Sequence, residues 1–311
     1  MSQRLKNLSS NPTLNNYIQG AAKQATSAVA EFIAPTVPVA KAVGKYKVWN
    51  DKTMLVVPDT RRPLGGDGAM IGFDFSDANY NCEPHAINTG VDFMEEDEND
   101  TVENLVKEGA NIAASLGAMS HEKRVLTAMA AGATAGTTID TTSADTKIIN
   151  IINGHLLDVI KGAKGWGDSI ELRLLIGASA LQKIIDHADV KNRYKQQSKA
   201  GGYFSPTLDD LAGMLMLPVN AKVSLMVQDA NVNLDAASVD FLLGSKVLVF
   251  AAKATPDRYD PSFMKTLRKM GEFMRPRYWQ APSGRQQYAG FDWSEEIKVT
   301  NAGASRLCTV S

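Results

Sequence analysis

The sequence predicts an α+β protein in which an N-terminal arm and an extended β-hairpin loop precede a long helix and a compact α/β domain. Three observations lead to this prediction. Strand-like alternation flanks a turn rich in proline and glycine within residues 45–92. A helical periodicity of apolar residues then runs from about 101 to 131. Finally, short strands alternate with short helices between residues 146 and 256.

Composition places the chain among ordinary globular proteins. Its 311 residues are 44% hydrophobic and 22% charged, which allows one large or two modest domains with a sizeable core. No apolar run approaches the roughly 20 residues needed to cross a bilayer, and the N-terminus lacks the apolar segment of a secretion signal. We therefore expect an intracellular chain with no membrane partner. Cys82 and Cys308 are too few for a disulfide framework, so we expect two small buried residues, with a pairing between them left open.

The charge is small in total but unevenly distributed. A formal net charge of -1 argues against a dedicated nucleic-acid binder. Residues 1–50 hold six basic residues and one acid, and so do residues 265–285, where Arg275 and Arg277 lie. An acidic block stands between these two segments and consists of Glu95, Glu96, Asp97, Glu98 and Asp100. Such blocks are either simply solvated or make complementary contacts between copies of the chain.

Residues 1–44 form the predicted N-terminal arm. Residues 1–31 are rich in Asn, Ser, Gln and Ala and show little apolar periodicity, which predicts a segment ordered only by a partner. Pro35 and Pro38 then fix an extended backbone and remove two donors, so we expect no regular strand pairing there.

Residues 45–92 form the predicted extended loop. Residues 45–50 run outward, 70–80 return, and "PDTRRPLGGDG" makes the tip. Such a hairpin has little core of its own and must lie on another surface. Because guanidinium groups suit bidentate pairing with carboxylates, we expect Arg61 and Arg62 at the tip to pair with acids of a neighbouring copy, with two solvated arginines as the alternative.

Residues 93–145 contain the long helix. Asp100 and Glu103 predict a capping box at its start, and the segment after the helix is typical of a linker. Residues 146–256 form the predicted α/β domain, which opens with a helix at 148–160.

Further elements of this domain follow from local signals. "SALQKIIDHA" predicts a helix capped by Ser179, and "SPTLDDLAGML" predicts one with Ser205 at its cap and Pro206 at its first position. Strands are predicted for "ELRLLIG", "AKVSLMVQ" and "SKVLVFAAK". Residues 257–311 are then expected to return to the strands beside the long helix, with Phe291 and Trp293 on one face.

Motifs for catalysis or cofactor binding are weak. "GGDGAMIG", residues 65–72, resembles a phosphate-binding loop, but strand-like residues follow it where a helix is needed. Cys82 and His85 have the spacing of half a zinc site, without a second pair to complete it.

Isolated titratable residues add little to this. The histidines at 121, 155 and 187 lie on or at the end of predicted helices, where a surface or capping role is usual. The possible acid or base residues are Asp186, Asp189, Asp209 and Asp210. None has a neighbour in sequence that would shift its pKa. We expect no enzyme and no cofactor, and we keep a nucleotide-using α/β enzyme as an alternative from another class.

Taken in order, the elements resemble those of the major capsid protein of tailed bacteriophages, the capsid fold of the phage Hong Kong 97 type. The resemblance runs from about Phe32 to the C-terminus and depends on order and spacing more than on any one residue. "IAPTVPVAKAVGKYKVWN" is similar to the entry into the extended loop, and "PDTRRPLGGDG" with "FSDANYNCEPHAINTGVD" to its tip and returning strand. "ELRLLIGASALQKIIDHADV" with "LDDLAGMLMLPVNAKVSLMV" is similar to the axial domain.

The resemblance implies a peripheral domain with a spine helix, an axial domain that meets its copies at five- and six-fold axes, and a loop that lies over a neighbour. It implies a virion protein that assembles with itself, as hexamers and pentamers, around double-stranded DNA in the host bacterial cytoplasm. A portal and separate scaffold or decoration proteins would be further partners, and Lys52 is a position where a covalent crosslink is conceivable. A shell of the encapsulin type is the nearest alternative.

The resemblance also implies a set of residues for contact between subunits. Apolar residues of the arm and hairpin need not be covered by their own chain if a neighbour buries them. The candidates are Val37, Val39, Tyr46, Trp49, Arg61, Arg62, Glu95, Glu96, Asp97, Glu98, Arg275 and Arg277.

Overall fold

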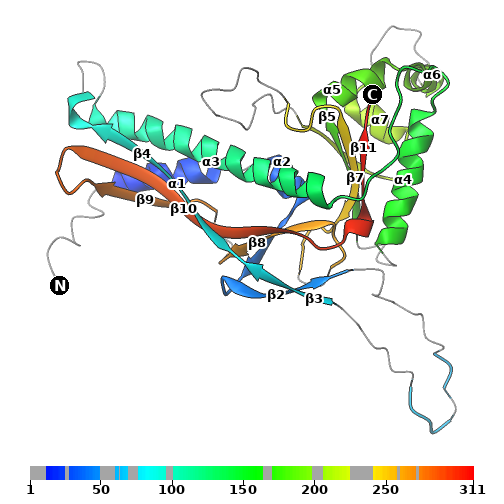
Figure 1. The fold of residues 1–311 in the computed structure, drawn as a ribbon, viewed down its shortest axis with the longest axis horizontal. Coiled ribbons are helices and arrows are strands. Elements are labelled where there is room, and N and C mark those ends of the chain that lie inside the picture. Colours follow the sequence, from blue (N-terminus) through cyan, green and yellow to red (C-terminus); the bar gives the residue numbers. More distant parts are fainter. Residues whose placement is uncertain are drawn as a thin grey trace.

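The computed structural model describes residues 12–24, 28–49, 60–62, 64–68, 76–95, 101–163, 170–197, 206–224, 241–257, 260–270 and 273–311. An α/β domain lies at one end of the molecule, and α3 (Val102–Gly132) extends away from it along a five-stranded sheet (Figure 1). At 1.5 Å per residue, the 31 residues of α3 span about 46 Å. The long helix predicted for 101–131 is confirmed to within one residue.

The start of α3 differs from the prediction in its cap. The N-cap residue is Thr101, whose side chain makes no capping hydrogen bond. Glu103 is therefore the second helical residue, one position too early for the reciprocal bond of a capping box. The predicted capping role of Asp100 is wrong because the N-cap position belongs to the next residue, and Asp100 itself lies outside the described residues.

The five-stranded sheet places β10 at its centre. Its strands are β1 (Thr36–Val39), β8 (Met264–Lys269), β10 (Gln286–Val299) and β4 (Glu83–Asp92), with β9 (Arg275–Gln280) also paired to β10. β10 pairs with β9 through its first half and with β8 through its second half, and β4 lies along its other edge. One face of this sheet packs on α3 through Val91, Phe291 and Trp293, which confirms the predicted shared face of the last two.

The described part of the N-terminal arm is ordered by its own chain. It forms α1 (Pro12–Gln24) and α2 (Ala28–Ile33). Leu14 and Ile18 of α1 are fully buried in one cluster with residues of α3, and α2 buries Ile33 beside Phe263. The expectation that residues 1–31 are ordered only by a partner is wrong for this part, because α1 carries an apolar face that the residue composition alone concealed.

The hairpin and the strand that precedes it differ in part from the prediction. β2 (Val43–Val48) and β3 (Ser76–Asn81) pair antiparallel, as predicted for the loop. β4, which was assigned to the loop from the sequence, instead pairs with β10 over ten residues. β1 pairs in parallel with β8, although Pro38 was expected to prevent pairing. Pro38 is tolerated because β1 is an edge strand, where a missing donor can face away from the sheet.

The α/β domain contains a four-stranded sheet in the order β11-β7-β5-β6. Its elements are α4 (Ile148–Gly162), β5 (Glu171–Gly177), α5 (Ala178–Asp186), α6 (Ala188–Gln197), α7 (Leu208–Gly213), β6 (Asn220–Ser224), β7 (Lys246–Ala252) and β11 (Ser305–Thr309). α4 covers this sheet through Ile149, Ile152 and Leu156. β11 comes from the C-terminal segment that was expected to return wholly to the other sheet, so the two domains share the end of the chain.

Helix boundaries in this domain differ from the sequence signals. α5 has Gly177 as its N-cap, so Ser179 is inside the helix. α7 begins after Thr207, which forms a capping box with Asp210. This cap is two residues beyond the predicted cap Ser205, which lies outside the described residues. α6 was not predicted because its sequence is mostly polar. Among its described side chains, Val190 is the one apolar residue that is fully buried.

Candidate functional site

Four apolar residues predicted for contact with a neighbour, Val37, Val39, Tyr46 and Trp49, are buried in their own chain. Their exposed fractions are 4%, 2%, 9% and 3%. The two valines and Tyr46 pack in one cluster with Leu267 of β8. The expectation that their own chain need not cover them is wrong, since all four are buried within it; Val37, Val39 and Tyr46 are covered where the β2–β3 ribbon packs on β1 and β8.

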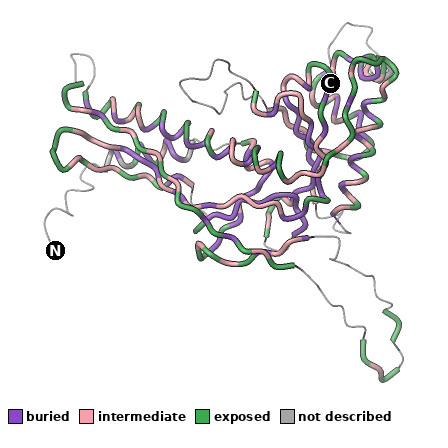
Figure 2. Tube along the Cα trace, in the orientation of Figure 1, coloured by how far each residue is buried: buried purple, intermediate pink, exposed green. Residues whose placement is uncertain are grey.

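Arg61 and Arg62 lie in the described part of the loop tip, residues 60–62 and 64–68. Both arginines are exposed, and Leu64 beside them is fully exposed. Figures 1 and 2 draw these tip residues apart from the rest of the described chain. A contact between the tip and a neighbouring copy stays a prediction.

The acidic block begins at an exposed 3₁₀ turn, Phe93–Glu95, which follows β4. Glu95 is exposed, and the apolar Phe93 and Met94 beside it are 37% and 92% exposed. The other predicted contact acids of the block, Glu96, Asp97 and Glu98, lie outside the described residues.

The basic segment 265–285 does not form one surface. Lys265 is 1% exposed, and its Nζ lies 3.0 Å from Asp260 Oδ2. Burial lowers the pKa of Lys265, and the Asp260 carboxylate partly opposes this. Arg275 and Arg277 are exposed on β9, but Arg277 Nη1 already lies 2.6 Å from Asp292 Oδ2 of the same chain.

Glu295 of β10 is the centre of a buried network that the sequence did not reveal. Its Oε1 accepts hydrogen bonds from His121 Nδ1 at 2.8 Å, Arg124 Nη2 at 2.6 Å and Trp293 Nε1 at 3.0 Å. Its Oε2 accepts two from Arg268, Nε at 3.0 Å and Nη2 at 2.9 Å. The carboxylate thereby joins β10 to α3 and β8 with five donors. The available signal was the alternation of Phe291, Trp293 and Glu295, which puts the acid on the buried face.

The network sets the protonation of two of its members. Burial raises the pKa of Glu295, but the hydrogen bond from His121 and the charges of His121, Arg268 and Arg124 outweigh it and hold that pKa well below its ordinary value. Burial, together with the Arg124 charge, lowers the pKa of His85. Because Arg124 Nη1 lies 2.6 Å from His85 Nε2 and can only donate, His85 accepts there and is neutral.

Residues Glu31 and Phe32 of α2 connect this network to the α/β domain. Glu31 Oε1 lies 3.5 Å from Arg268 Nη1. The next residue, Phe32, accepts a hydrogen bond at its carbonyl from Arg173 Nη1 at 2.6 Å, and its ring packs edge-on against Phe250. α2 therefore contacts both sheets, which fixes their relative position.

Of the motifs weighed from the sequence, "GGDGAMIG" lies partly outside the described residues, which end at Gly68 there, whereas Cys82 and His85 are both described. Cys82 Sγ donates to Leu267 O in an apolar cluster, whereas His85 belongs to the Glu295 network, so the half zinc site does not form. Both cysteines are buried and free, as expected from the sequence, so the pairing that was left open does not form. Across the described ranges, no three His, Cys, Asp or Glu side chains are grouped to hold a metal ion, and no helix is long and apolar enough to span a bilayer.

Most of the remaining titratable candidates have structural partners, whereas Asp209 is an exposed residue of α7. His187 accepts from the backbone N–H of Asp189 at Nδ1 and lies 2.9 Å from Ser143 O at Nε2. Asp210 caps α7, and Asp186 Oδ1 lies 3.0 Å from Lys191 Nζ. His155 Nε2 accepts from the backbone N–H of Thr137. These residues hold helix ends and loops together.

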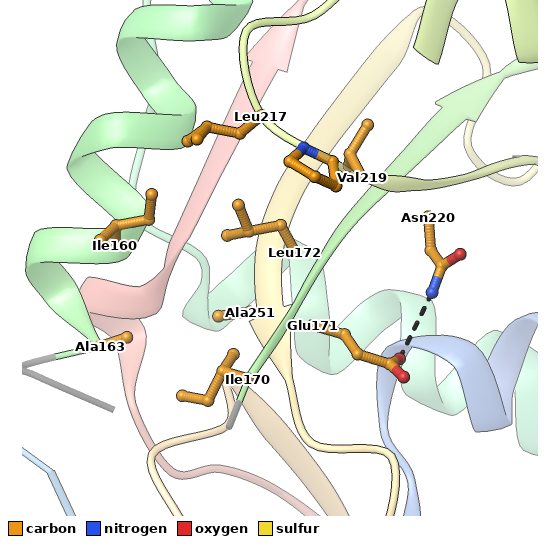
Figure 3. A pocket seen from close by; sticks show the side chains of 10 residues that line it. Ile160, Ala163, Ile170, Glu171, Leu172, Leu217, Val219, Asn220 and Ala251 are labelled. Carbon is orange, nitrogen blue, oxygen red and sulfur yellow. Dashed lines mark hydrogen bonds between the residues drawn. The ribbon is translucent and has the colours of Figure 1, made fainter. Parts of the chain in front are cut away.

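The α/β domain has an open apolar hollow of about 540 Å³ between α4, β5 and β6 (Figure 3). Ile160, Leu172, Leu217 and Val219 line it. Glu171 forms part of its edge, where the Asn220 amide lies 3.5 Å from the carboxylate. The polar groups of this hollow do not converge on one point inside it, whereas a small-molecule site usually has a few polar groups that do.

Solved structures similar to this chain include phage capsids, an encapsulin and a protein described as phage-related. A phage-related protein from Bordetella bronchiseptica RB50 is 16% identical, with a TM-score of 0.70 over 97% of both chains. The capsid of bacteriophage PhiM1 is 11% identical, with a TM-score of 0.55 over 91% of this chain and 86% of the other. The SrpI encapsulin of Synechococcus elongatus PCC 7942 is 10% identical, with a TM-score of 0.52 over 92% and 88%. No family model and no curated protein matches the sequence. The chain has the capsid fold of the Hong Kong 97 type.

Proposed function

We propose that this chain is the major capsid protein of a tailed phage, a structural protein that assembles as hexamers and pentamers into an icosahedral head around double-stranded DNA. The observation that supports this most is the likeness over 97% of both chains to a protein described as phage-related. A net charge of -1 suits a wall that encloses DNA without binding it tightly. On this proposal the chain is part of the virion and is assembled in the host bacterial cytoplasm, with a portal and separate scaffold or decoration proteins as partners.

A structural role also agrees with how the charged residues are used. Four deeply buried ionisable groups, Glu295, Arg268, Lys265 and Asp260, are held in ion pairs inside the fold. Each has protein partners, and none of the four lines the apolar hollow of the α/β domain. We therefore propose no catalytic activity and no cofactor.

Electron microscopy of the overexpressed chain tests the shell. We expect uniform closed particles in the purified material. A chain that stays monomeric, or that stops at a small closed oligomer under every condition of salt and concentration, would contradict the proposal.

A nanocompartment shell of the encapsulin type is the second candidate. The SrpI encapsulin matches this fold about as well as the phage capsids do, with a TM-score of 0.52 against 0.54 and 0.55. The contents of particles from the native source separate the two functions. Nuclease-protected DNA supports the phage head, whereas a packed protein without DNA supports the compartment.

A further inference from the structure

Two exposed patches of opposite charge lie at different places on the molecule. The first, here called the lysine patch, surrounds the turn between β1 and β2 and the end of β8. It consists of Lys41, Val43, Lys45, Lys269 and Met270, all exposed. Val43 and Met270 are large apolar residues with 63% and 71% of their surface in water.

The backbone brings this patch together. Val39 lies opposite Lys269 in the parallel pair of β1 and β8, and its carbonyl accepts the backbone N–H of Met270 at 2.9 Å. Val43 and Lys45 are two residues apart on β2 and therefore share its outer face. Met270 has a φ of 58°, a left-handed conformation that is uncommon for residues other than glycine and that persists only where the surroundings hold it.

Among the described residues, Lys47 next to the patch is held in an ion pair, whereas the lysines of the patch are not. Lys47 Nζ lies 2.6 Å from Asp77 on the paired strand. The lysines at 41, 45 and 269 form no ion pair with any described residue within 4 Å. Glu83, the first residue of β4, is an exposed acid. The patch thus keeps an excess of positive charge beside apolar surface.

The second patch, here called the acidic tip, follows the far end of β4. It consists of Asp92, Phe93, Met94 and Glu95. Asp92 holds the turn by accepting the backbone N–H of Met94 at 3.0 Å, so the Met94 side chain is presented to solvent. The sequence continues with four more acids, Glu96, Asp97, Glu98 and Asp100.

The lysine patch and the acidic tip do not meet within one chain. The backbone N–H of Cys82 donates to Ala42 O, which puts the start of β4 at the lysine patch. The acidic tip lies at the other end of this ten-residue strand. At roughly 3.3 Å per residue, about 30 Å separates the two ends. Figure 1 shows the same separation, with the end of β4 at the far left and the β2–β3 ribbon below the centre.

We infer that the acidic tip of one copy docks on the lysine patch of the next copy. Opposite charges orient the two surfaces, and burial of Phe93 and Met94 against Val43 and Met270 supplies apolar contact. Such a contact joins two different patches, so it is heterologous and propagates from copy to copy into a ring or lattice. The inference rests on the proposed self-assembly and names the surfaces that would carry part of it.

Charge reversal tests the contact in the full chain. Lys45→Glu and Glu95→Lys are each expected to raise the protein concentration at which particles appear by about tenfold, because like charges then face each other at every copy of the contact. The combination of both changes restores opposite charges and should bring that concentration back to within about threefold of wild type. Lys195→Glu and Glu108→Lys, at exposed positions on α6 and α3, are matched controls that should leave assembly unchanged.

A crosslink gives a second measurement that needs no change of charge. A chain with Lys45→Cys and Glu95→Cys should form disulfide-linked multimers when its particles are oxidised, whereas either change alone should not. The two natural cysteines are buried, so they contribute little background.

The outcomes separate this contact from the proposed function. If the wild type forms particles and both charge reversals assemble normally, the contact is overturned but the proposed shell is not. The same holds if the reversals impair assembly and the combination of both does not restore it. The absence of multimers from the double cysteine variant would do the same. A wild-type chain that never assembles would overturn both proposals.

Discussion

At the level of single residues, Glu295 joins three elements of the fold through one carboxylate. Its five donors come from α3, from β8 and from β10 itself. A buried charge is costly unless it is fully paired, and this one is 1% exposed with each oxygen bonded at least twice. Removal of its charge would leave the buried Arg268 with only the longer contact to Glu31, at 3.5 Å, as its ion pair.

Glu295→Gln should therefore destabilise the folded chain. We expect a loss of about 3–5 kcal/mol in the free energy of unfolding, the usual cost of breaking a buried ion pair from one side. Urea denaturation followed by circular dichroism measures it. Glu83→Gln, an exposed acid on β4, is the control and should cost less than about 1 kcal/mol. A cost for Glu295→Gln as small as that of the control would mean that the network does not stabilise the fold.

His85 predicts a decrease in stability on mild acidification. Its pKa in the folded chain is lowered from about 6.5, first by burial and then by Arg124. As the pH falls below about 6.5, the unfolded chain takes up protons that the folded chain does not, so the free energy of unfolding decreases. Burial lowers the pKa of His155 in the same way. Stability is thus complete above this range and declines below it.

Denaturation curves between pH 7 and 5 measure this decline. His85→Gln keeps an acceptor for Arg124 but does not titrate, so its stability should depend less on pH than that of the wild type. The remaining dependence should come from His155 and from carboxylates. An unchanged slope in His85→Gln would show that His85 does not titrate differently in the two states.

At the level of elements, α1 is the clearest departure from expectation. The sequence of the arm is polar overall, but its apolar residues Leu14 and Ile18 are one helical turn apart and face α3. Tyr17 on the same helix accepts a hydrogen bond from Asn111 Nδ2 of α3 at 2.8 Å. α1 is therefore part of the fold of the single chain.

Ile18→Ala tests whether α1 is docked in the isolated chain. Ile18 is 0% exposed, and truncation of such a residue costs about 2–5 kcal/mol. The melting temperature of unassembled protein should fall. Gln19→Ala, at the exposed neighbouring position, should leave it unchanged. If Ile18→Ala melts like the wild type before assembly and only weakens particles, α1 is ordered by a partner after all.

The loop tip predicts the opposite behaviour, a defect in assembly without a defect in folding. Arg61 and Arg62 are exposed, so replacing both with Glu should leave circular dichroism and solubility unchanged. If the tip contacts acids of a neighbour, the double variant should fail to close shells or should form shells that dissociate with salt, since about 1 kcal/mol per contact is multiplied over the lattice. Microscopy at low and high salt measures this. Normal shells under both conditions would eliminate the contact, and a misfolded variant would show that the tip packs on its own chain.

At the level of the whole molecule, the fold is elongated and its two sheets are joined by α2. Its exposed charged and apolar surfaces lie at separate places. The loop tip, the acidic tip and the lysine patch are drawn far from one another (Figure 2). A chain with this shape leaves charged and apolar surface that it cannot pair with itself. Such surfaces suit repeated contacts between identical copies, in which each patch meets a different patch of the neighbour.

Local patterns in the sequence were enough for the main elements of this fold. The helix of 31 residues, the β2–β3 pairing, the strands β5 and β7 and the buried face of β10 all follow from periodicity, which depends only on neighbouring residues. The order of these elements was sufficient to suggest the capsid fold. The exact caps were missed, because shifting a helix start by one residue changes the capping partner without changing the periodicity.

Long-range packing was beyond the reach of these patterns. Whether Val37, Val39, Tyr46 and Trp49 face a neighbour or their own chain depends on where the β2–β3 ribbon lies, and no local signal contains that information. The basic residues of 265–285 are close in sequence, but β8 buries both Lys265 and Arg268 between neighbouring strands and leaves Lys269 exposed only at its end. A charge becomes part of the core or of the surface only when distant strands and helices pack around it, and that packing is a property of the complete fold.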